Sequence, residues 1–464
     1  MPFLPAAHRL PFTHTAHRSP LTAYWHMSDL TETQARGILE TVMRMSRADT
    51  CQAAIGGGSG GNIRFARNSV STAGETSNRS LNVSSSFGRR TGSASGNEFD
   101  DAALERVVRR AEELARLAPE NPEWVEPLGP QQYLTTPGYF ESTAAIGPEY
   151  RARVAADSIL PSREGSCVAA GFLQDGPRWS ALMNSKGLFA YDRRTDLDFS
   201  LTVRTEDDLG SGFVARDYND AARFDSGASA RVAIGKAIAS RTTRAIEPGK
   251  YTVILEPTAV SDFIGNLLNG FNARGAEEGR TYLSKRGGGT RLGEKLVSER
   301  VSLSTDPMHP DVPAPGWGFD GLPRRAMTFV EDGVVKRLNY DRVWAARKGV
   351  EPTPSPGNLI MSGGTGTVDD LVRDTARGIL VTRFWYIRSV DPQTLLLTGL
   401  TRDGTFFIED GKIRYAIKNF RFNESPIIML NNVEAMGTPV RQGGNLFPPI
   451  RARDFTFSSL SDAV

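Results

Sequence analysis

The chain has 464 residues, of which 39% are hydrophobic and 23% are charged, a composition typical of a globular protein with two or three domains. Its 55 basic and 53 acidic side chains are interspersed, which argues against a broad nucleic-acid-binding surface, and no apolar run is long enough to span a membrane. Cys51 and Cys167 are the only cysteines, which excludes a disulfide framework and a cysteine-based zinc site, so we expect a cytoplasmic protein.

Residues 1–26 differ in composition from the rest of the chain. They hold four of the five histidines and several prolines but no acidic residue, and they lack the apolar core of a signal peptide. The sequence from Met27 onward reads as a natural start, with Ser28 or Thr31 capping a helix. We therefore expect residues 1–26 to be a disordered extension or the product of a misplaced start codon. The spacing of their histidines fits no metal-binding helical face.

The first part of the body is predicted to contain helices and short strands. Apolar periodicity indicates helices over residues 31–45 and 100–117. The run Gly56–Gly61 has no following Lys-Ser/Thr pair and no helix start, so we interpret it as a flexible hairpin tip rather than a phosphate loop. The strand-like runs of this part cover residues 52–55, 62–67 and 82–87.

A linker marked by Pro119, Pro122 and Pro130 leads to a second set of elements. Helices are predicted at about 148–159 and 226–240. Asp175-Gly176-Pro177 is interpreted as the turn of a hairpin. The strand-like runs of this part cover residues 166–174, 179–183, 187–191 and 197–205.

From Tyr251 onward the chain is predicted to be mostly short strands. The pairs Asp332-Gly333, Asp403-Gly404 and Asp410-Gly411 lie between alternating apolar runs, which is a strong hairpin signal. The predicted class is therefore α+β, with a large, mainly antiparallel sheet or barrel in the C-terminal half. We divide the chain into the extension 1–26, an N-terminal α+β domain at 27–220 and a β-rich domain at 221–464.

Residues 260–271 are predicted to form one helix whose apolar stripe follows the helical repeat. Asp262, Asn266 and Asn269 then share the opposite side. Neutral amides are poor zinc ligands, and Asp262 alone cannot hold a metal. The stripe consists of Val260, Phe263, Ile264, Leu267, Leu268 and Phe271.

Two other features invite a functional interpretation. The loop Gly363–Gly366 precedes a helix predicted at 368–377, so its backbone amides could meet an anion, or Thr367 could simply cap that helix. His309 is the only histidine after residue 26 and lies in a proline-rich loop, where a single imidazole is more often a surface or packing residue than a base. No Gly-x-Ser-x-Gly elbow is present, although a Ser/Lys mechanism stays open.

From Tyr251 to about Gly437 the chain resembles the TldD/PmbA (TldE) family, described as U62-type metallopeptidases or modulators of DNA gyrase. The N-terminal half fits this resemblance more loosely. The markers are Val253-Ile-Leu-Glu-Pro257, residues 298–307, Gly318-Phe-Asp-Gly-Leu-Pro-Arg-Arg325, Val330-Glu-Asp-Gly333, residues 340–349, Pro356-Gly-Asn-Leu359, residues 369–371 and Gly378-Ile-Leu-Val381.

The resemblance implies a lost zinc site. In the zinc-bearing branch, the helix after the strand at Val253 carries a His-Glu-x-x-x-His motif, and the same spacing places Gly265, Asn266 and Gly270 at the His, Glu and His positions of this chain. Glycine has no side chain to bind zinc, and asparagine cannot deprotonate a zinc-bound water. We therefore expect no catalytic residue, no metal site and no cofactor in this chain, and zinc in a partner subunit.

The PmbA/TldE branch shows the same loss, and the resemblance implies its role as the non-catalytic subunit of a heterodimeric peptidase that processes or degrades unfolded peptides. The expected partners are a zinc-bearing TldD-like subunit and an unfolded peptide, with neither membrane nor direct nucleic-acid binding. Two alternatives stay open, a stand-alone hydrolase with a displaced or non-zinc site and a peptide-binding homodimer.

Overall fold

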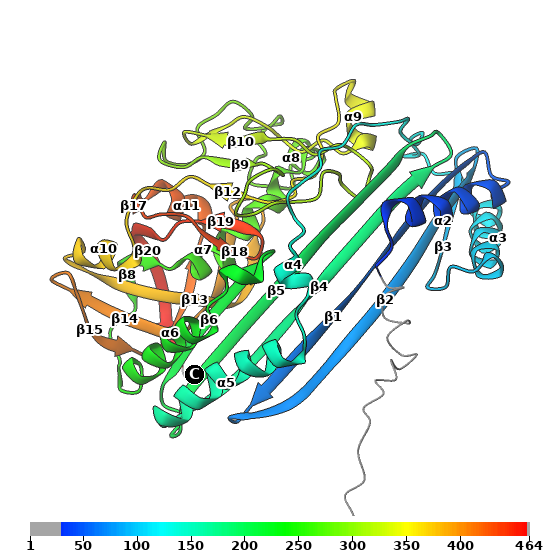
Figure 1. Ribbon diagram of the computed structural model, residues 1–464. Helices are drawn as coiled ribbons and strands as arrows, with labels where there is room; N and C mark the ends of the chain where they lie inside the picture. The colour runs from blue at the N-terminus through cyan, green and yellow to red at the C-terminus, as the bar shows by residue number, and fades with distance from the viewer. Residues whose placement is uncertain (1–28, 462–464) are drawn as a thin grey trace, which may run out of the picture.

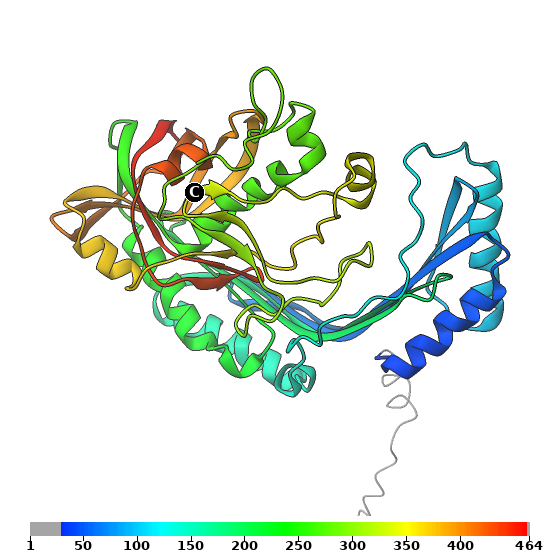
Figure 2. The ribbon, with the colours of Figure 1, turned by 90° about the horizontal axis from the view of Figure 1, so that it is seen from above.

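The computed structural model of the protein describes residues 29–461, and the predicted extension at 1–26 lies outside them. The described part contains a long bent sheet and a C-terminal half built on its inner face (Figure 1, Figure 2). Within it, no helix is long and apolar enough to cross a membrane.

The first sheet is antiparallel throughout and has the strand order β3-β2-β1-β4-β5-β6. Figure 2 shows that the sheet bends midway along its longest strands, so that one face is concave. The strands are β1 (Thr50–Ala66), β2 (Ser69–Phe87), β3 (Arg90–Gly96), β4 (Cys167–Asn184), β5 (Phe189–Thr205) and β6 (Ser211–Tyr218).

The glycine run Gly56–Gly61 lies inside β1, so its interpretation as a flexible hairpin tip is wrong. The run pairs with β2 on one side and β4 on the other. A Cβ at Gly58 would lie 2.4 Å from the carbonyl oxygen of Pro177, and one at Gly60 would lie 2.2 Å from that of Asp175. Glycine is required because β1 and β4 approach closely where the sheet bends.

Asp175-Gly176-Pro177 is likewise not a turn, because β4 continues through it and pairs with β5 along its length. The predicted runs at 187–191 and 197–205 belong to the single strand β5. Gly56–Gly61 and Asp175-Gly176-Pro177 both carry turn-favouring residues, yet each lies in a strand that pairs with a neighbour on both sides. This pairing satisfies more backbone hydrogen bonds than a turn would.

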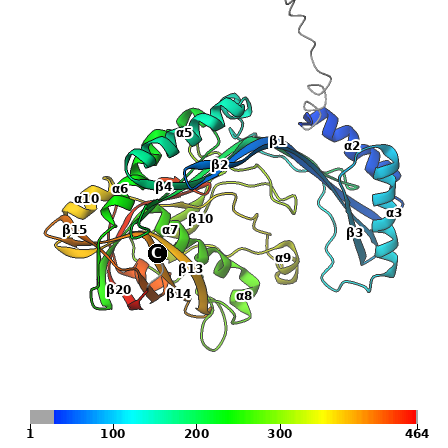
Figure 3. The same ribbon diagram turned by 90° about the horizontal axis from the view of Figure 1, so that it is seen from below.

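The predicted N-terminal helices are confirmed, and they cover the convex face of the sheet (Figure 3). Thr31 and Gln34 form a capping box at the first helix, and Asp100 caps the second. One half of the face carries α2 (Glu32–Met45) and α3 (Asp101–Leu117), and the other carries α5 (Pro148–Glu164) and α6 (Ser226–Ala239). Two short helices, α4 (Glu141–Ala144) and η1 (Ala221–Arg223), connect these layers.

The C-terminal half contains a barrel, one of the two forms that the sequence left open. Its strands follow the order β13-β8-β20-β16-β14, and pairing of β13 with β14 closes the ring. A cluster of phenylalanine rings that includes Phe263, Phe384 and Phe455 fills the interior. The strands are β7 (Thr243–Arg244), β8 (Gly249–Leu255), β13 (Arg377–Asp391), β14 (Leu396–Glu409), β15 (Lys412–Ile417), β16 (Phe420–Glu424), β17 (Val433–Met436) and β20 (Ile450–Leu460).

A smaller sheet with the order β11-β10-β9-β12-β19-β18 packs beside the barrel. Its strands are β9 (Leu303–Thr305), β10 (Met327–Glu331), β11 (Val334–Val335), β12 (Ile360–Met361), β18 (Val440–Gln442) and β19 (Asn445–Phe447). The helices of this half are α7 (Pro257–Ile264), η2 (Gly265–Phe271), α8 (Ala273–Glu277), α9 (Arg342–Lys348), α10 (Val368–Arg373) and α11 (Pro426–Asn431).

Two of the three predicted Asp-Gly turns are confirmed, because Asp332-Gly333 joins β10 to β11 and Asp410-Gly411 joins β14 to β15. The third, Asp403-Gly404, is wrong as a turn. It lies inside β14, where both residues have positive φ and the register with β13 shifts between Val381 and Arg383. The pair therefore forms a β-bulge, in which the positive φ angles that the other two Asp-Gly pairs use in turns occur within a strand.

Candidate functional site

The prediction of one helix over residues 260–271, the segment that the resemblance aligns with the zinc motif, is wrong in part. Residues 257–264 form α7, but Gly265–Phe271 form the 3-10 helix η2 rather than a continuation of the α-helix. The two glycines and two asparagines of this segment favour the α-helix poorly. The side-chain amide of Asn266 also donates to the carbonyl oxygens of Asp262 (3.1 Å) and Phe263 (3.3 Å), which competes with α-helical hydrogen bonds.

The predicted apolar stripe is confirmed despite this change. Its members pack into the main core of the C-terminal half, and only Leu268 stays partly exposed. The fully buried members are Val260, Phe263, Ile264, Leu267 and Phe271.

The three motif positions have different surroundings. Gly265 is exposed, with nothing within 4 Å of the place that a Cβ would take. Gly270 is buried, and a Cβ there would lie 2.0 Å from the ring of Tyr282. Tyr282 is 2% exposed, and its hydroxyl donates to the carbonyl oxygen of Leu267 at 2.6 Å. An imidazole at position 270 would therefore have to displace a buried, hydrogen-bonded tyrosine.

Asp262 is the only carboxylate next to these positions on α7, and it is already engaged. Its Oδ2 accepts a hydrogen bond from the Phe384 amide at 3.0 Å. Burial raises the pKa of Asp262 to about 6, although Arg383 and the Phe384 amide act to lower it. Asn269 is exposed. The residues present do not fit a hydrolytic zinc ion, because they offer one carboxylate and no imidazole.

A charged cluster lies beside Asp262 and was not predicted from the sequence. Arg383 lies 3.5 Å from the buried carboxylate of Asp403 and stacks on the ring of Phe213 at 3.9 Å. Asp403 accepts a hydrogen bond from the Ser211 hydroxyl at 2.5 Å, and burial lowers the pKa of Arg383. The cluster joins β6 of the first sheet to β13 and β14 of the barrel. No sequence signal could have found it, because its members are far apart in the chain.

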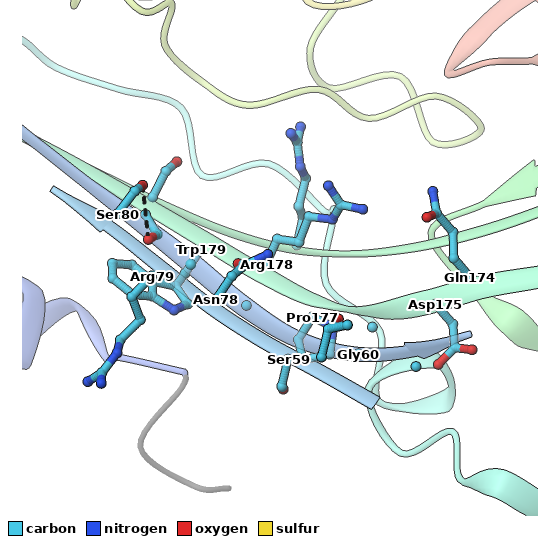
Figure 4. A pocket seen from close by; sticks show the side chains of 18 of the residues that line it. Ser59, Gly60, Asn78, Arg79, Ser80, Gln174, Asp175, Pro177, Arg178 and Trp179 are labelled. Carbon is cyan, nitrogen blue, oxygen red and sulfur yellow. Dashed lines mark hydrogen bonds between the residues drawn. The ribbon is translucent and has the colours of Figure 1, made fainter. Parts of the chain in front are cut away.

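A cavity of about 590 Å³ lies at the bend of the first sheet. Figure 4 shows that Gln174 and Arg178 point toward the loops of the C-terminal half, whereas Asp175 and Arg79 point to the other side. The glycines of β1 leave the floor of this cavity without side chains.

A second cavity of about 410 Å³ continues from the first and shares Gln174, Arg178 and Arg194 with it. Arg178 and Arg194 lie 3.2 Å and 3.9 Å from Asp196. We call the two cavities together the polar trough. Its guanidinium, carboxylate and amide groups can hold a polar chain by hydrogen bonds, but its lining contains neither histidine nor cysteine to serve as a base or nucleophile.

The Gly363–Gly366 loop supports the capping interpretation. Thr367 and Asp370 form a capping box at α10, in which the Thr367 amide donates to the Asp370 carboxylate at 2.7 Å. That carboxylate takes the position in which an external anion would bind. The helix ends at Arg373 rather than at the predicted residue 377, because β13 begins at Arg377.

His309 lies in a loop where its Nδ1 accepts a hydrogen bond from the backbone amide of Asp311 at 3.2 Å, so the side chain organises its own turn. Within residues 29–461, no three His, Cys, Asp or Glu side chains gather as a group that could hold a metal ion.

Family models cover most of the chain. The PmbA/TldA metallopeptidase domain 1 matches residues 52–115, the central domain matches 153–246 and the C-terminal domain matches 248–459. A curated relative, a metalloprotease from Methanothermobacter thermautotrophicus, is 22% identical over 289 residues, which are 57% of this chain and 61% of the relative. The chain thus matches about three fifths of that relative's length.

Solved structures share the fold at low sequence identity. TldE from Thermococcus kodakarensis is 18% identical with a TM-score of 0.80, covering 92% of this chain and 99% of that chain. A candidate modulator of DNA gyrase from Thermotoga maritima is 14% identical with a TM-score of 0.82, covering 91% and 100%. A similar protein from Bacteroides thetaiotaomicron is 18% identical with a TM-score of 0.80, covering 93% and 100%.

Proposed function

The chain belongs to the PmbA/TldA (TldD/PmbA) metallopeptidase family, and from this premise we propose that it is the zinc-free subunit of a heterodimeric peptidase. In this proposal a TldD-like partner carries the zinc and the hydrolytic chemistry. This chain supplies part of the wall of an enclosed space that admits unfolded peptides and excludes folded proteins.

The observation that carries the proposal is the packing of Tyr282 against Gly270. A position that has merely lost a histidine would leave room for an imidazole, whereas here the space holds a buried tyrosine ring. Its neighbour Asn266 uses its amide on the backbone of α7. The motif segment therefore serves as a packing element of the core, which supports a structural role for this subunit.

The polar trough supports the role in peptide binding. It lies at the bend of the first sheet and is lined mainly by hydrogen-bond donors and acceptors. Polar groups of this kind can satisfy the amide and carbonyl groups of an extended chain without selecting particular side chains. Such a surface suits a subunit that holds many unfolded sequences.

Reconstitution with a zinc-bearing family member tests the proposal. We expect the isolated chain to carry no stoichiometric zinc and to leave an unfolded peptide uncleaved, and we expect cleavage to appear when the zinc-bearing protein is added. The control is the zinc-bearing protein with the Glu of its His-Glu-x-x-x-His motif changed to Gln, which should pair but not cleave. One equivalent of tightly bound zinc in the isolated chain would overturn the assignment.

A further inference from the structure

The first half of β2 forms an open edge of the long sheet (Figure 1). β2 pairs with β1 along its whole length, but β3 covers its outer side only from Leu81 to Phe87. Within residues 29–461, no strand therefore pairs with the outer side of residues 69–80, and all of these residues are exposed. We call residues 72–80 the β2 edge, because they pair with β1 without a bulge.

The β2 edge lacks several of the devices that usually protect such strands. It contains neither proline nor lysine, and its register with β1 is regular from Thr72 to Ser80. In a strand, alternate residues turn their N–H and C=O groups to each side, so about half of these residues present both groups outward. An edge of this kind can accept a further strand.

The charges of the β2 edge are self-complementary. Glu75 and Arg79 are its only charged residues, and their even spacing places both on the face that carries Gly61 and Gly57 of β1. An antiparallel second copy centred on Ser77 would place each Glu75 opposite an Arg79. A parallel copy in register would instead place Glu75 opposite Glu75, which is destabilising.

We infer that the β2 edge pairs antiparallel with the β2 edge of a second copy of this chain, with the two-fold axis at Ser77. Gly74 then lies opposite Ser80 and Thr76 opposite Asn78, and the two long sheets become continuous. Leu81 is already paired with β3, so the contact covers residues 74–80. A seven-residue strand pairing is smaller than a standard protein interface, so we expect a weak dimer with a dissociation constant on the order of 10 µM.

The surroundings of the two charged side chains allow this pairing. The Glu75 side chain is 44% exposed and lies 3.4 Å from Arg151, so its carboxylate can accept further hydrogen bonds. Arg79 is exposed, with its guanidinium 5.4 Å from the centre of the Phe99 ring. The pairing concerns the isolated chain and does not depend on the proposed peptidase partner, so each proposal can fail without the other.

Disulfide cross-linking tests the register. In Ser77→Cys the two cysteines lie directly opposite each other, at a Cα separation that suits a disulfide. We expect oxidised glutathione to convert this variant into a covalent dimer. The matched control is Ala73→Cys on the same face of the strand, whose two copies lie about 26 Å apart and should not cross-link. Background reaction is small, because Cys51 and Cys167 are buried.

Charge exchange tests the complementarity. Glu75→Arg and Arg79→Glu each replace two attractive pairs with two repulsive pairs, so either variant should weaken dimerisation at least about tenfold in sedimentation velocity. Mixing the two variants restores opposite charges in both pairs of residues 75 and 79. The double variant restores them as well. Both the mixture and the double variant should therefore recover the native affinity. Arg90→Glu on β3 is the control and should change nothing.

Each result decides for or against the pairing. A chain that stays monomeric at about 100 µM, well above the expected dissociation constant, overturns it. Equal cross-linking of Ser77→Cys and Ala73→Cys also overturns it, and so does cross-linking of Ser77→Cys only to an added zinc-bearing family member. Thermal unfolding of each single variant separates lost pairing from lost folding, and recovery on mixing cannot arise from a misfolded chain.

Discussion

At the scale of single residues, the two glycines that the family resemblance aligns with the histidines of the zinc motif are not equivalent. Gly265 faces solvent, whereas Gly270 lies against the ring of Tyr282. The sequence showed that both positions lack a zinc ligand. It could not show which of them is packed against a neighbour, because Tyr282 is twelve residues from Gly270 in the chain and meets it only in the folded structure.

The two glycines make a matched pair of substitutions. We expect Gly270→Ala to destabilise the protein by about 2 kcal/mol, because the new methyl group would overlap the Tyr282 ring. Gly265→Ala should be neutral or stabilising by about 0.5 kcal/mol, because its side chain enters open space at a helical φ of −51°. Urea unfolding of both variants measures the difference, and equal stability of the two would contradict the packing described for Tyr282.

Asp262 gives a pH-dependent prediction. Burial raises its folded-state pKa from the ordinary 3.8 to about 6, so the folded protein binds this proton more tightly than the unfolded chain. The group therefore favours folding below pH 3.8, and this contribution is lost as the pH rises through about 6. Asp262→Asn removes the dependence, so its stability relative to the native chain should rise by up to about 3 kcal/mol between about pH 4 and about pH 7.

Urea unfolding of both proteins at the two pH values tests this expectation. Asparagine keeps an oxygen that can accept the hydrogen bond from the Phe384 amide, so the variant should fold normally. A stability difference that stays constant across the pH range would contradict the raised pKa.

At the scale of elements, β1 and β4 show how tertiary pairing overrides a local signal. The run Gly56–Gly61 and the sequence Asp175-Gly176-Pro177 both favour turns, yet the two strands continue through them side by side. The same glycines that suggest a turn permit the close approach at the bend. Helix caps and apolar stripes were predicted correctly because they depend on neighbours within four residues.

Substitutions at two glycines distinguish a glycine that the close approach of β1 and β4 requires from a glycine that has open space beside it. We expect Gly60→Val to destabilise the protein by about 3 kcal/mol or more, because a Cβ there would lie 2.2 Å from the Asp175 carbonyl oxygen. Gly74→Val in the neighbouring strand should have little effect, because nothing lies within 4 Å of its Cβ position. Comparable losses in chemical denaturation would show that the bend does not require glycine.

At the scale of the whole molecule, buried polar contacts hold the first sheet to the barrel. Ser211 at the start of β6 donates to Asp403 in the bulge of β14, and Asp403 also lies near Arg383. Arg441 from the β18 strand lies 2.7 Å from Asp217 of β6. These contacts fix the position of the barrel over the concave face, and hence the shape of the polar trough.

Removal of one of these contacts should loosen the whole assembly. We expect Ser211→Ala to cost about 2 kcal/mol, because the buried Asp403 carboxylate loses a hydrogen-bond donor. Differential scanning calorimetry should show a lower Tm and a transition that broadens as the two halves uncouple. Ser95→Ala on the β3 strand serves as a control and should leave the transition unchanged.

The sequence by itself determined the α+β class, the four long helices of the N-terminal half with the caps at Thr31 and Asp100, and the lack of a zinc-binding side chain at Gly265, Asn266 and Gly270. Each of these follows from side-chain chemistry within a short window or from a missing functional group. Only the tertiary structure decided that Gly56–Gly61 belongs to a bent strand, that Tyr282 fills the space beside Gly270 and that Ser211 meets Asp403. These features depend on which distant segments become neighbours, and that choice is made by the packing of the whole chain.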